Sequence, residues 1–401
     1  MARKLIYLPI EVKARELDAK LLLAYYAVFA GFDIIIGDMP TIYTLSETNQ
    51  KGIVFFKGGP HGFRERMITH SYEFGHQIVE LDEEGFLFQP TLYLQDRMQK
   101  KSLDMVTQEY CWGQNQFDTI VGAYPQSKDK VFVTGNPRFD LLSPKYRQLY
   151  KEDSNQLIDK YGDFILINTR FSIYNTAKGF KKTVHFKHIE QLYIEFIKMI
   201  KQLASELPNQ TIIVRPHPGE NRQSYQKELH TFQNVKIIHE GSLVPWLNAA
   251  KVVIHNGCTS GVEAYLLDKL VIAYVPFETK EAQLPNVLSN QATTVEEVIQ
   301  LLKDSHKRND DILHNHYKIE NDTHAYTEII SLLEKVDTVS YQERLRINKF
   351  PVVKRKKSKR IFSLTENEIA MFFHRLNEID NKKQIIDIHE ICSNVYYLSL
   401  E

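Results

Sequence analysis

Short apolar runs alternate with amphipathic stretches along the first third of the chain. Each run is rich in Ile, Val, Leu or Phe and ends in glycine or polar residues, which is typical of a strand buried in a sheet. The predicted strands cover residues 4–10, 32–37, 52–59, 76–81, 109–113 and 130–137. Residues 14–31 instead repeat apolar positions at helical spacing up to Gly31. Alternating strands and helices predict a parallel, doubly wound sheet of the α/β class.

The same alternation begins again at residue 164, after a polar and charged stretch (138–163) that predicts a helical connection. The predicted strands of this second half cover residues 164–169, 211–216, 235–240, 251–257 and 269–275. The predicted helices cover residues 186–206, 221–232, 243–250, 259–268, 294–304 and 322–335. Two successive α/β halves predict two Rossmann-like domains facing a cleft, where ligands bind beyond the carboxyl ends of the strands.

The last part of the chain has a different pattern. Residues 341–360 carry nine basic side chains and one acidic side chain, and a predicted helix follows them. We therefore expect three segments: an N-terminal Rossmann-like domain (1–145), a second Rossmann-like domain (146–336) and a mainly helical, basic extension (337–401).

Composition excludes several classes of protein. The chain has 401 residues, with 50 Lys and Arg balancing 50 Asp and Glu, so its overall charge does not indicate nucleic acid as a partner. The three cysteines, Cys111, Cys258 and Cys392, are far apart, which favours a reducing compartment and argues against structural zinc. No signal peptide and no apolar stretch of membrane-spanning length is recognisable. We expect a cytoplasmic protein.

A histidine between two prolines follows the strand 211–216. Pro216 and Pro218 restrict the backbone on both sides of His217, so its side chain is expected to be held at the carboxyl end of the sheet. There His217 could donate a hydrogen bond to a phosphate, with charge added by Arg215. The alternative is a rigid loop in which both side chains only satisfy backbone carbonyls.

A strand–turn–helix element spans residues 255–269. Thr259, Ser260 and Gly261 lie at the expected helix start, where hydroxyls, N–H groups and the helix dipole favour an anion. Glu263, one turn further on, could bond the two hydroxyls of a ribose. The alternative is an ordinary capping box formed by Ser260 and Glu263.

Three carboxylates, Asp82, Glu83 and Glu84, precede Gly85 after the strand 76–81. One of them could act as a general base or a nucleophile at the carboxyl end of the sheet. A solvated acidic turn is the alternative.

Two further loops at predicted strand ends carry polar groups. In the first domain, Lys57, Gly58, Gly59 and His61 form a candidate acceptor-binding loop, although it matches neither a Walker A loop nor a GxGxxG fingerprint. A plain strand–helix loop is the alternative. In the second domain, the candidates for contact with a donor phosphate or sugar are Asn168, Thr169 and Arg170. Because there is no DxD motif and no set of residues at metal-ligand spacing, we expect neither a metal nor a cofactor.

Taken together, an acidic-acidic-glycine element, a His-Pro element and a hydroxyl pair resemble bacterial GT-B glycosyltransferases that use CMP-activated sugars. This group includes sialyltransferases and Kdo transferases. The stretches LPIEVKARELDAKLLLA, GNPRFD, VRPHPGE and HNGCTSGVEAYLLDK are most similar to surface carbohydrate biosynthesis proteins, and the similarity spans roughly residues 1–336.

The resemblance implies a role for each matched residue. Glu83 matches the catalytic carboxylate, with an uncertainty of one residue because the acidic run has three members. His217 matches the histidine that bonds the CMP phosphate, Thr259 and Ser260 match the hydroxyl pair on that phosphate, and Glu263 matches a ribose-binding position.

The implied function is transfer of Kdo or a related nonulosonic sugar from a CMP donor to a glycan or lipid-linked glycan acceptor, without metal. The stereochemical outcome stays open. Alternative functions are a UDP-sugar 2-epimerase or a CDP-alditol phosphotransferase of GT-B-like fold, and a non-catalytic scaffold of polysaccharide assembly. The basic residues 344–360 could hold the protein at an anionic membrane surface, on the inner face of the cytoplasmic membrane. A solvated charge run is the alternative.

Overall fold

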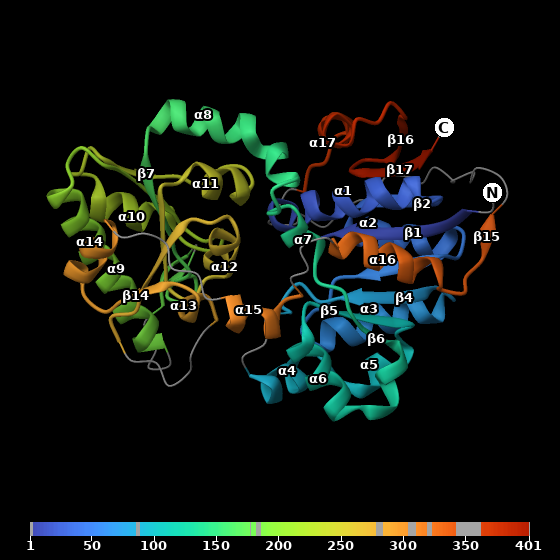
Figure 1. The fold of residues 1–401 in the computed structure, drawn as a ribbon. Coiled ribbons are helices and arrows are strands. Elements are labelled where there is room, and N and C mark those ends of the chain that lie inside the picture. Colours follow the sequence, from blue (N-terminus) through green and yellow to red (C-terminus); the bar gives the residue numbers. More distant parts are fainter. Residues whose placement is uncertain are drawn as a thin grey trace. The chain divides into compact units, whose positions relative to one another are not determined.

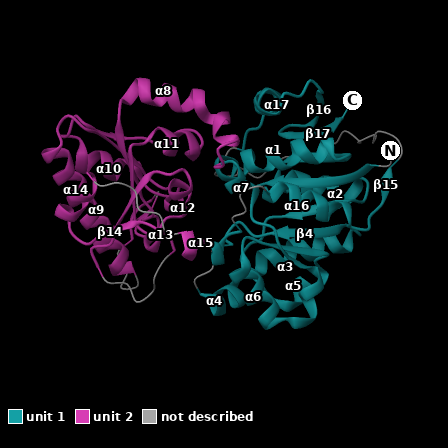
Figure 2. Ribbon diagram, viewed as in Figure 1, with its two compact units in different colours: residues 1–141, 314–401 teal, residues 142–313 magenta. Residues whose placement is uncertain are grey.

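The computed structural model describes residues 3–85, 89–176, 178–181, 186–277, 284–303, 310–318, 323–341 and 362–400. The basic residues 344–360 lie outside this part of the chain. Two compact units are formed, unit 1 by residues 1–141 with 314–401 and unit 2 by residues 142–313 (Figure 2). Residues 314–336, which the sequence pattern assigns to the second domain, are thus grouped with unit 1, as is the C-terminal extension.

Unit 1 is built on a sheet of nine strands, ordered β16-β17-β2-β1-β3-β4-β5-β6, with β15 paired to β1. The strands are β1 (Arg3–Ile10), β2 (Phe32–Asp38), β3 (Ile53–Phe56), β4 (Gln77–Leu81), β5 (Gln108–Cys111), β6 (Val131–Val133), β15 (Ser340–Tyr341), β16 (Ile386–Cys392) and β17 (Val395–Leu400). From β2 to β6 the pairs are parallel, as the alternating pattern predicts. Because β2 and β3 lie on opposite sides of β1, the chain reverses direction across the sheet beside β1.

The helices of unit 1 connect these strands and pack on the sheet (Figure 1). They are α1 (Lys13–Phe29), α2 (Met39–Thr48), α3 (His61–Glu73), α4 (Pro90–Asp96), α5 (Lys100–Met105), α6 (Gln114–Ala123), the 3-10 helix η1 (Pro125–Lys130), α7 (Pro137–Asp140), α15 (Asp310–His316, at the boundary with unit 2), α16 (Ala325–Glu334) and α17 (Glu366–Asp380). Helix α1 packs against β1 and β2 and also against α7, α16 and α17. Most of its residues are buried because it has neighbours on several sides.

The C-terminal extension completes the sheet of unit 1. Strands β16 and β17 form an antiparallel hairpin, and β17 pairs antiparallel with β2. The sequence pattern predicted the helix but not this hairpin. The approach of β17 to β2 requires a glycine, because a Cβ on Gly37 would lie 2.1 Å from the backbone oxygen of Asn394.

Unit 2 contains a parallel sheet of six strands in the order β11-β10-β7-β12-β13-β14. These strands are β7 (Phe164–Asn168), β10 (Thr211–Arg215), β11 (Val235–Ile237), β12 (Val252–His255), β13 (Leu270–Tyr274) and β14 (Asn290–Ala292), and a separate two-stranded sheet consists of β8 (Asn175–Thr176) and β9 (Gly179–Phe180). The neighbours β7 and β12 are the strands between which the chain changes direction, so the switch point of a Rossmann-like sheet lies there.

The helices of unit 2 pack around this sheet. They are η2 (Tyr146–Tyr150), α8 (Lys151–Tyr161), α9 (Lys187–Glu206), α10 (Arg222–Leu229), α11 (Leu243–Ala249), α12 (Thr259–Leu266), α13 (Leu284–Val287) and α14 (Val295–Leu301). Helix α9 buries one apolar face in a core that also contains Ile165, Ile167 and Val214 of the central strands. The predicted α/β class, with two Rossmann-like halves, is confirmed.

Candidate functional site

At the switch point of unit 2, two predicted site residues lie in contact. Asn168 ends β7, and its Nδ2 atom donates a hydrogen bond of 3.0 Å to Oγ of Ser260 in the first turn of α12. Both side chains are buried. The loops after β7 and β12 are therefore joined by polar groups at the place where Rossmann-like sheets bind ligands.

The start of α12 is not a capping box. The helix begins at Thr259, its N-cap residue is Cys258, and no side chain caps it. Ser260 instead donates to Sγ of Cys258 at 3.0 Å. Thr259 is exposed, whereas Gly261 and Glu263 are buried. Because the hydroxyl of Ser260 is not used as a cap, the anion-binding interpretation of this helix start remains a prediction.

Gly261 is explained by packing. A Cβ at this position would lie 2.3 Å from Nε2 of His255, whose buried ring accepts or donates a 3.0 Å hydrogen bond with Oγ of Ser289. Burial, together with the nearby charge of Arg170, lowers the pKa of His255 to about 3. His255 is therefore a neutral core residue at neutral pH.

Arg215 bonds backbone carbonyls, and its role in nucleotide binding stays a prediction. Its guanidinium donates to the backbone oxygens of Glu240 (2.7 Å) and Gly241 (2.8 Å) and lies 5.4 Å from the centre of the Trp246 ring. Burial lowers its pKa to about 10. These contacts turn the guanidinium toward the loop after β11.

His217 and Pro218 are exposed beyond the end of β10. The backbone N–H of Gly219 donates to Nδ1 of His217 at 3.1 Å. Since Nδ1 acts as the acceptor, the neutral ring carries its hydrogen on Nε2. His217 is thus held in the tautomer that can donate from Nε2.

Glu220, which the sequence analysis did not select, connects the loops after β7 and β10. Its buried carboxylate accepts hydrogen bonds from the hydroxyl of Thr169 (2.9 Å), from the backbone of Phe171 (3.0 Å) and from the backbone of His217 (3.2 Å). The hydroxyl of Tyr225 donates to its other oxygen at 2.5 Å. The sequence contained no signal for this carboxylate, because a glutamate after a Pro-Gly turn is usually solvated.

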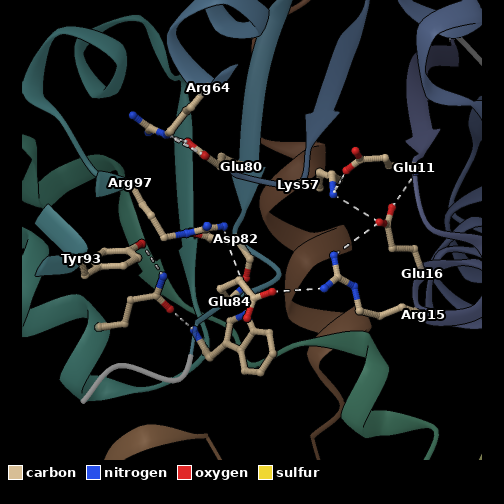
Figure 3. A network of polar contacts seen from close by, with 12 residues as sticks. Glu11, Arg15, Glu16, Lys57, Arg64, Glu80, Asp82, Glu84, Tyr93 and Arg97 are labelled. Carbon is tan, nitrogen blue, oxygen red and sulfur yellow. Dashed lines mark hydrogen bonds and ion pairs between the residues drawn. The ribbon is translucent and has the colours of Figure 1, made fainter. Parts of the chain in front are cut away.

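The acidic run of unit 1 separates into three different environments. Asp82 is buried and forms a two-point ion pair with Arg97, at 2.8 and 2.5 Å (Figure 3). Glu84 is exposed and pairs with Arg15 at 3.1 Å. Glu83 is partly buried, and its Oε2 atom is shielded with no hydrogen-bond partner in the described part of the chain.

The pKa of Glu83 is raised by burial and by the nearby carboxylate of Glu16. The surroundings of Glu83 therefore favour its protonated form, and its catalytic role stays a prediction. Gly85 is again explained by packing, because a Cβ there would lie 2.3 Å from the ring of Trp112.

Lys57, in the predicted acceptor loop, is buried in an ion-pair cluster at the switch point of unit 1. Its Nζ atom lies 2.5 Å from Glu11 and 3.3 Å from Glu16 (Figure 3). Burial opposes ionisation of Glu16, but Lys20 and Lys57 outweigh it and lower its pKa to about 2. The cluster holds the loop after β3 against the start of α1.

The other residues of that loop also have local explanations. Gly58 has a positive φ of 75°, and a Cβ there would lie 2.6 Å from Cγ of Asp82. A Cβ on Gly59 would lie 2.6 Å from the ring of Phe63. His61 is the first residue of α3, and its Nε2 lies 3.7 Å from Glu65. The glycines allow close packing within unit 1, and a role for the loop in ligand binding stays a prediction.

A second buried network in unit 1 was not expected from sequence. Arg64 of α3 forms an ion pair with Glu80 at 2.5 Å, and Glu109, next to Glu80 on the adjacent strand, lies 3.6 Å from the same guanidinium (Figure 3 shows Arg64 and Glu80). Burial and the charge of Glu80 raise the pKa of Glu109 well above its usual value. One arginine thus lies between two buried carboxyls, and the environment of Glu109 favours its protonated form.

In the described part of the chain, no group of three or more His, Cys, Asp or Glu side chains is placed to hold a metal ion. The same residues include no helix whose length and apolar character would let it cross a membrane.

Comparison with known proteins places the chain in a structural class. No protein-family model matches it, and no curated protein matches it either. Solved structures do match, and they define the fold as GT-B-like.

Three of these structures are UDP-GlcNAc 2-epimerases by their descriptions. The protein from Methanocaldococcus jannaschii has a TM-score of 0.55 at 12% identity, covering 83% of this chain and 99% of its own. A putative epimerase from Listeria monocytogenes gives 0.56 at 11%, covering 83% and 95%. The Neisseria meningitidis protein, bound to UDP-GlcNAc, gives 0.54 at 14%, covering 83% and 100%.

These similarities correct the functional prediction. The expected CMP-sugar glycosyltransferase, with Kdo or a sialic-acid-like sugar as its donor group, is wrong: many of the similar structures are UDP-GlcNAc 2-epimerases, several of them solved with UDP or UDP-GlcNAc. The GT-B-like part of the resemblance is retained. The findings favour the alternative that the sequence analysis kept open, a UDP-sugar 2-epimerase.

Proposed function

We propose that this protein is a sugar-nucleotide enzyme that inverts carbon 2 of a UDP-linked sugar. The observation that carries the proposal is the similarity, over 83% of the chain, to UDP-GlcNAc 2-epimerases that were solved with UDP-GlcNAc. The identity is only 12–14% for these proteins. The residues at the two strand ends must therefore support the proposal by their own chemistry.

Unit 2 supplies the nucleotide site in this proposal. The diphosphate would lie at the start of α12, where the helix dipole favours negative charge and Ser260 provides a hydroxyl. His217 would donate from Nε2, and Glu263 would bond the ribose. The contact between Asn168 and Ser260 supports this site, because it joins the two loops that flank the switch point.

Glu83 of unit 1 is the candidate for proton transfer. Inversion of carbon 2 breaks one C–H bond and forms another on the opposite face, so substrate and product contain the same atoms and no acceptor is consumed. Because the C2–H bond of the intact sugar is not acidic, we expect it to break as UDP leaves C1, which forms a C1=C2 double bond; UDP then adds back at C1 while a proton is delivered to the opposite face of C2. One group takes up the first proton and another group delivers the second, and Glu83 is the candidate for one of these two roles. The raised pKa of Glu83 fits this requirement.

The direct test is to incubate the protein with UDP-GlcNAc in D2O without any acceptor and to follow carbon 2 by proton NMR. We expect the C2 epimer to appear and deuterium to enter at C2. An unchanged substrate, together with no stabilisation of the protein by UDP, would contradict the proposal and favour a scaffold without activity.

A thermal-shift panel of UDP, UMP, CDP and CMP tests the nucleotide separately. We expect UDP to stabilise the protein most. Ser260→Ala should weaken UDP binding about tenfold, the usual effect of losing a hydrogen bond to a charged group. Ser205→Ala is the matched control, because Ser205 is exposed on α9 and bonds only the backbone of its own helix in the described structure. A preference for CMP would contradict the assignment.

A further inference from the structure

The loop after β10 has very few backbone groups that could anchor it. Pro216 and Pro218 have no N–H, so His217 provides the one backbone donor of these three residues. That N–H donates to Oε1 of Glu220 at 3.2 Å. The loop also closes as a turn, because the N–H of Glu220 donates to the backbone oxygen of His217 at 2.8 Å. Glu220 therefore holds the loop through both its side chain and its backbone.

The same carboxylate is attached to the loop after β7. Thr169 and Phe171 both donate to Oε1 of Glu220, at 2.9 and 3.0 Å. Thr169 directly follows Asn168, whose amide reaches Ser260. These hydrogen bonds, together with the peptide bond between Asn168 and Thr169, thus connect the His217 loop through Glu220 to the switch point.

Neighbouring contacts make this attachment rigid. Tyr225, fully buried on α10, donates to Oε2 of Glu220 at 2.5 Å and lies 3.1 Å from the hydroxyl of Thr169. Asn175 bonds the backbone oxygen of Asn221 at 3.1 Å. An isolated bridge pairs Thr176 with Glu220. Four donors from three segments converge on a carboxylate that is only 6% exposed.

The His217 ring depends on the shape of this loop. Its Nδ1 atom accepts from the N–H of Gly219, which lies inside the turn that Glu220 closes. If the turn opened, Nδ1 would lose this donor, and the ring would no longer be restricted to the tautomer with hydrogen on Nε2.

We propose that Glu220 is a positioning residue: its carboxylate ties the His217 loop to the loop after β7 and thereby presents Nε2–H of His217 as a donor to the diphosphate of the bound nucleotide. The ligand in this statement rests on the proposed function. The fixed tautomer does not, because it follows from contacts within unit 2.

The first experiment needs no ligand. Nitrogen-15 NMR of histidine-labelled protein, with the His217 signal assigned from His217→Gln, reports which ring nitrogen carries the hydrogen. We expect the Nε2–H tautomer in the wild type and a mixture of both tautomers in Glu220→Ala. The Nδ1–H tautomer in the wild type, or an unchanged tautomer in a folded Glu220→Ala, would overturn the proposal.

The second experiment measures the affinity for UDP. Glu220→Ala should bind UDP about tenfold more weakly, the typical loss for a misplaced hydrogen bond to a charged group. Glu220→Gln should restore most of the affinity, since its amide oxygen can occupy the place of Oε1 and the hydroxyl of Tyr225 can turn to accept from its amide nitrogen. Equal affinity in the wild type and Glu220→Ala would contradict the proposal.

A matched control is Glu228→Ala on α10, the helix that also carries Tyr225. Glu228 is exposed and forms an ion pair only with Lys201 in the described structure. In this control, neither the His217 tautomer nor the affinity for UDP should differ from the wild type.

If Glu220→Ala does not fold, Thr169→Val removes one of the same bonds and should weaken UDP binding about threefold. If UDP binds none of the proteins while the tautomer changes in Glu220→Ala, the positioning role stands and the proposed function fails.

Discussion

The carboxylates of Asp82, Glu83 and Glu84 follow β4 within one short turn, and their neighbours decide what each can do. Arg97 donates two hydrogen bonds to Asp82, and Arg15 pairs with Glu84 at the surface. Glu83 has a shielded oxygen without a hydrogen-bond partner in the described residues. At the scale of single residues, Glu83 is therefore the member of this run on which the proposed proton transfer depends.

Glu83→Gln should reduce the rate of epimerisation by about 10²–10⁴-fold, the usual contribution of a general acid or base. The amide has nearly the same shape but cannot exchange a proton. Initial rates from the NMR assay, with circular dichroism to verify folding, provide the measurement. Glu73→Gln serves as the control, because Glu73 is exposed at the end of α3, away from the carboxyl ends of the strands. A Glu83→Gln enzyme as fast as this control would exclude the role.

The raised pKa of Glu83 also predicts how stability depends on pH. The folded state binds this proton more tightly than the unfolded state, so the contribution of Glu83 to stability is fully present below the unfolded pKa of about 4.5. It is lost as the pH rises through the folded pKa. Urea unfolding at pH 5 and pH 8 should show Glu83→Gln gaining stability relative to the wild type at the higher pH. The opposite sign would mean that Glu83 is ionised in the fold.

At the scale of elements, the short helix α7 supplies the side chain that caps the start of helix α16. Helix α16 has no cap from its own N-cap residue, His324. Instead Asp140 of α7 accepts from the backbone of Ala325 at 2.9 Å and of Tyr326 at 3.0 Å. This contact, between residues far apart in sequence, is one reason why residues 314–336 belong to unit 1.

Asp140→Ala should lower the free energy of unfolding by about 1–3 kcal/mol, because two buried N–H groups lose their acceptor. Asp140→Asn should lose less, because its amide oxygen can still accept from one of the two N–H groups. Asp129→Ala, at an exposed position in η1, should change stability by no more than about 0.5 kcal/mol. Urea unfolding followed by circular dichroism measures all three. Equal values for Asp140→Ala and Asp129→Ala would contradict the capping role.

At the scale of the whole molecule, the end of the chain is part of the unit 1 core. Tyr25 and Tyr26 of α1 bond Asn377 (2.6 Å) and Asp380 (2.8 Å) of α17. The ammonium of Lys382 lies 4.1 Å from the centre of the Phe29 ring. Together with the pairing of β17 and β2, these contacts make the extension a structural component of unit 1.

Leu398→Ala should therefore destabilise unit 1 by about 2–5 kcal/mol, because Leu398 is fully buried in β17 and its loss leaves a cavity. Ile385→Ala is the matched control beside the hairpin, since Ile385 is 64% exposed. Chemical denaturation measures the difference. Equal stability of the two variants would show that the extension does not contribute to the core.

This integration also changes how the membrane prediction is tested. Deleting residues 341–401 would remove β16, β17 and α17 and so damage unit 1 itself. Replacing the basic residues between 344 and 360 by glutamine leaves the hairpin intact, and flotation with anionic liposomes then compares the two proteins. Equal binding would exclude the basic run as a membrane contact.

Local patterns in the sequence were sufficient for the α/β class, for most strands and for the loops at which polar side chains gather. Apolar runs such as those of β7 and β10 indicate strands that are buried on both faces of a sheet. The prolines beside His217 restrict the backbone whatever the tertiary structure is. These properties depend on a few neighbouring residues, so they could be read in order along the chain.

Tertiary structure decided which partners each of those polar residues contacts. Arg215 and Glu220 lie five positions apart, yet the first bonds the loop after β11 and the second joins the loops after β7 and β10. The sequence also did not predict that the C-terminal extension pairs with β2. Nor did it predict that Glu83 has a different environment from Asp82 and Glu84. Each depends on hydrogen bonds, ion pairs and burial between segments distant in the chain, and no local pattern records those distances.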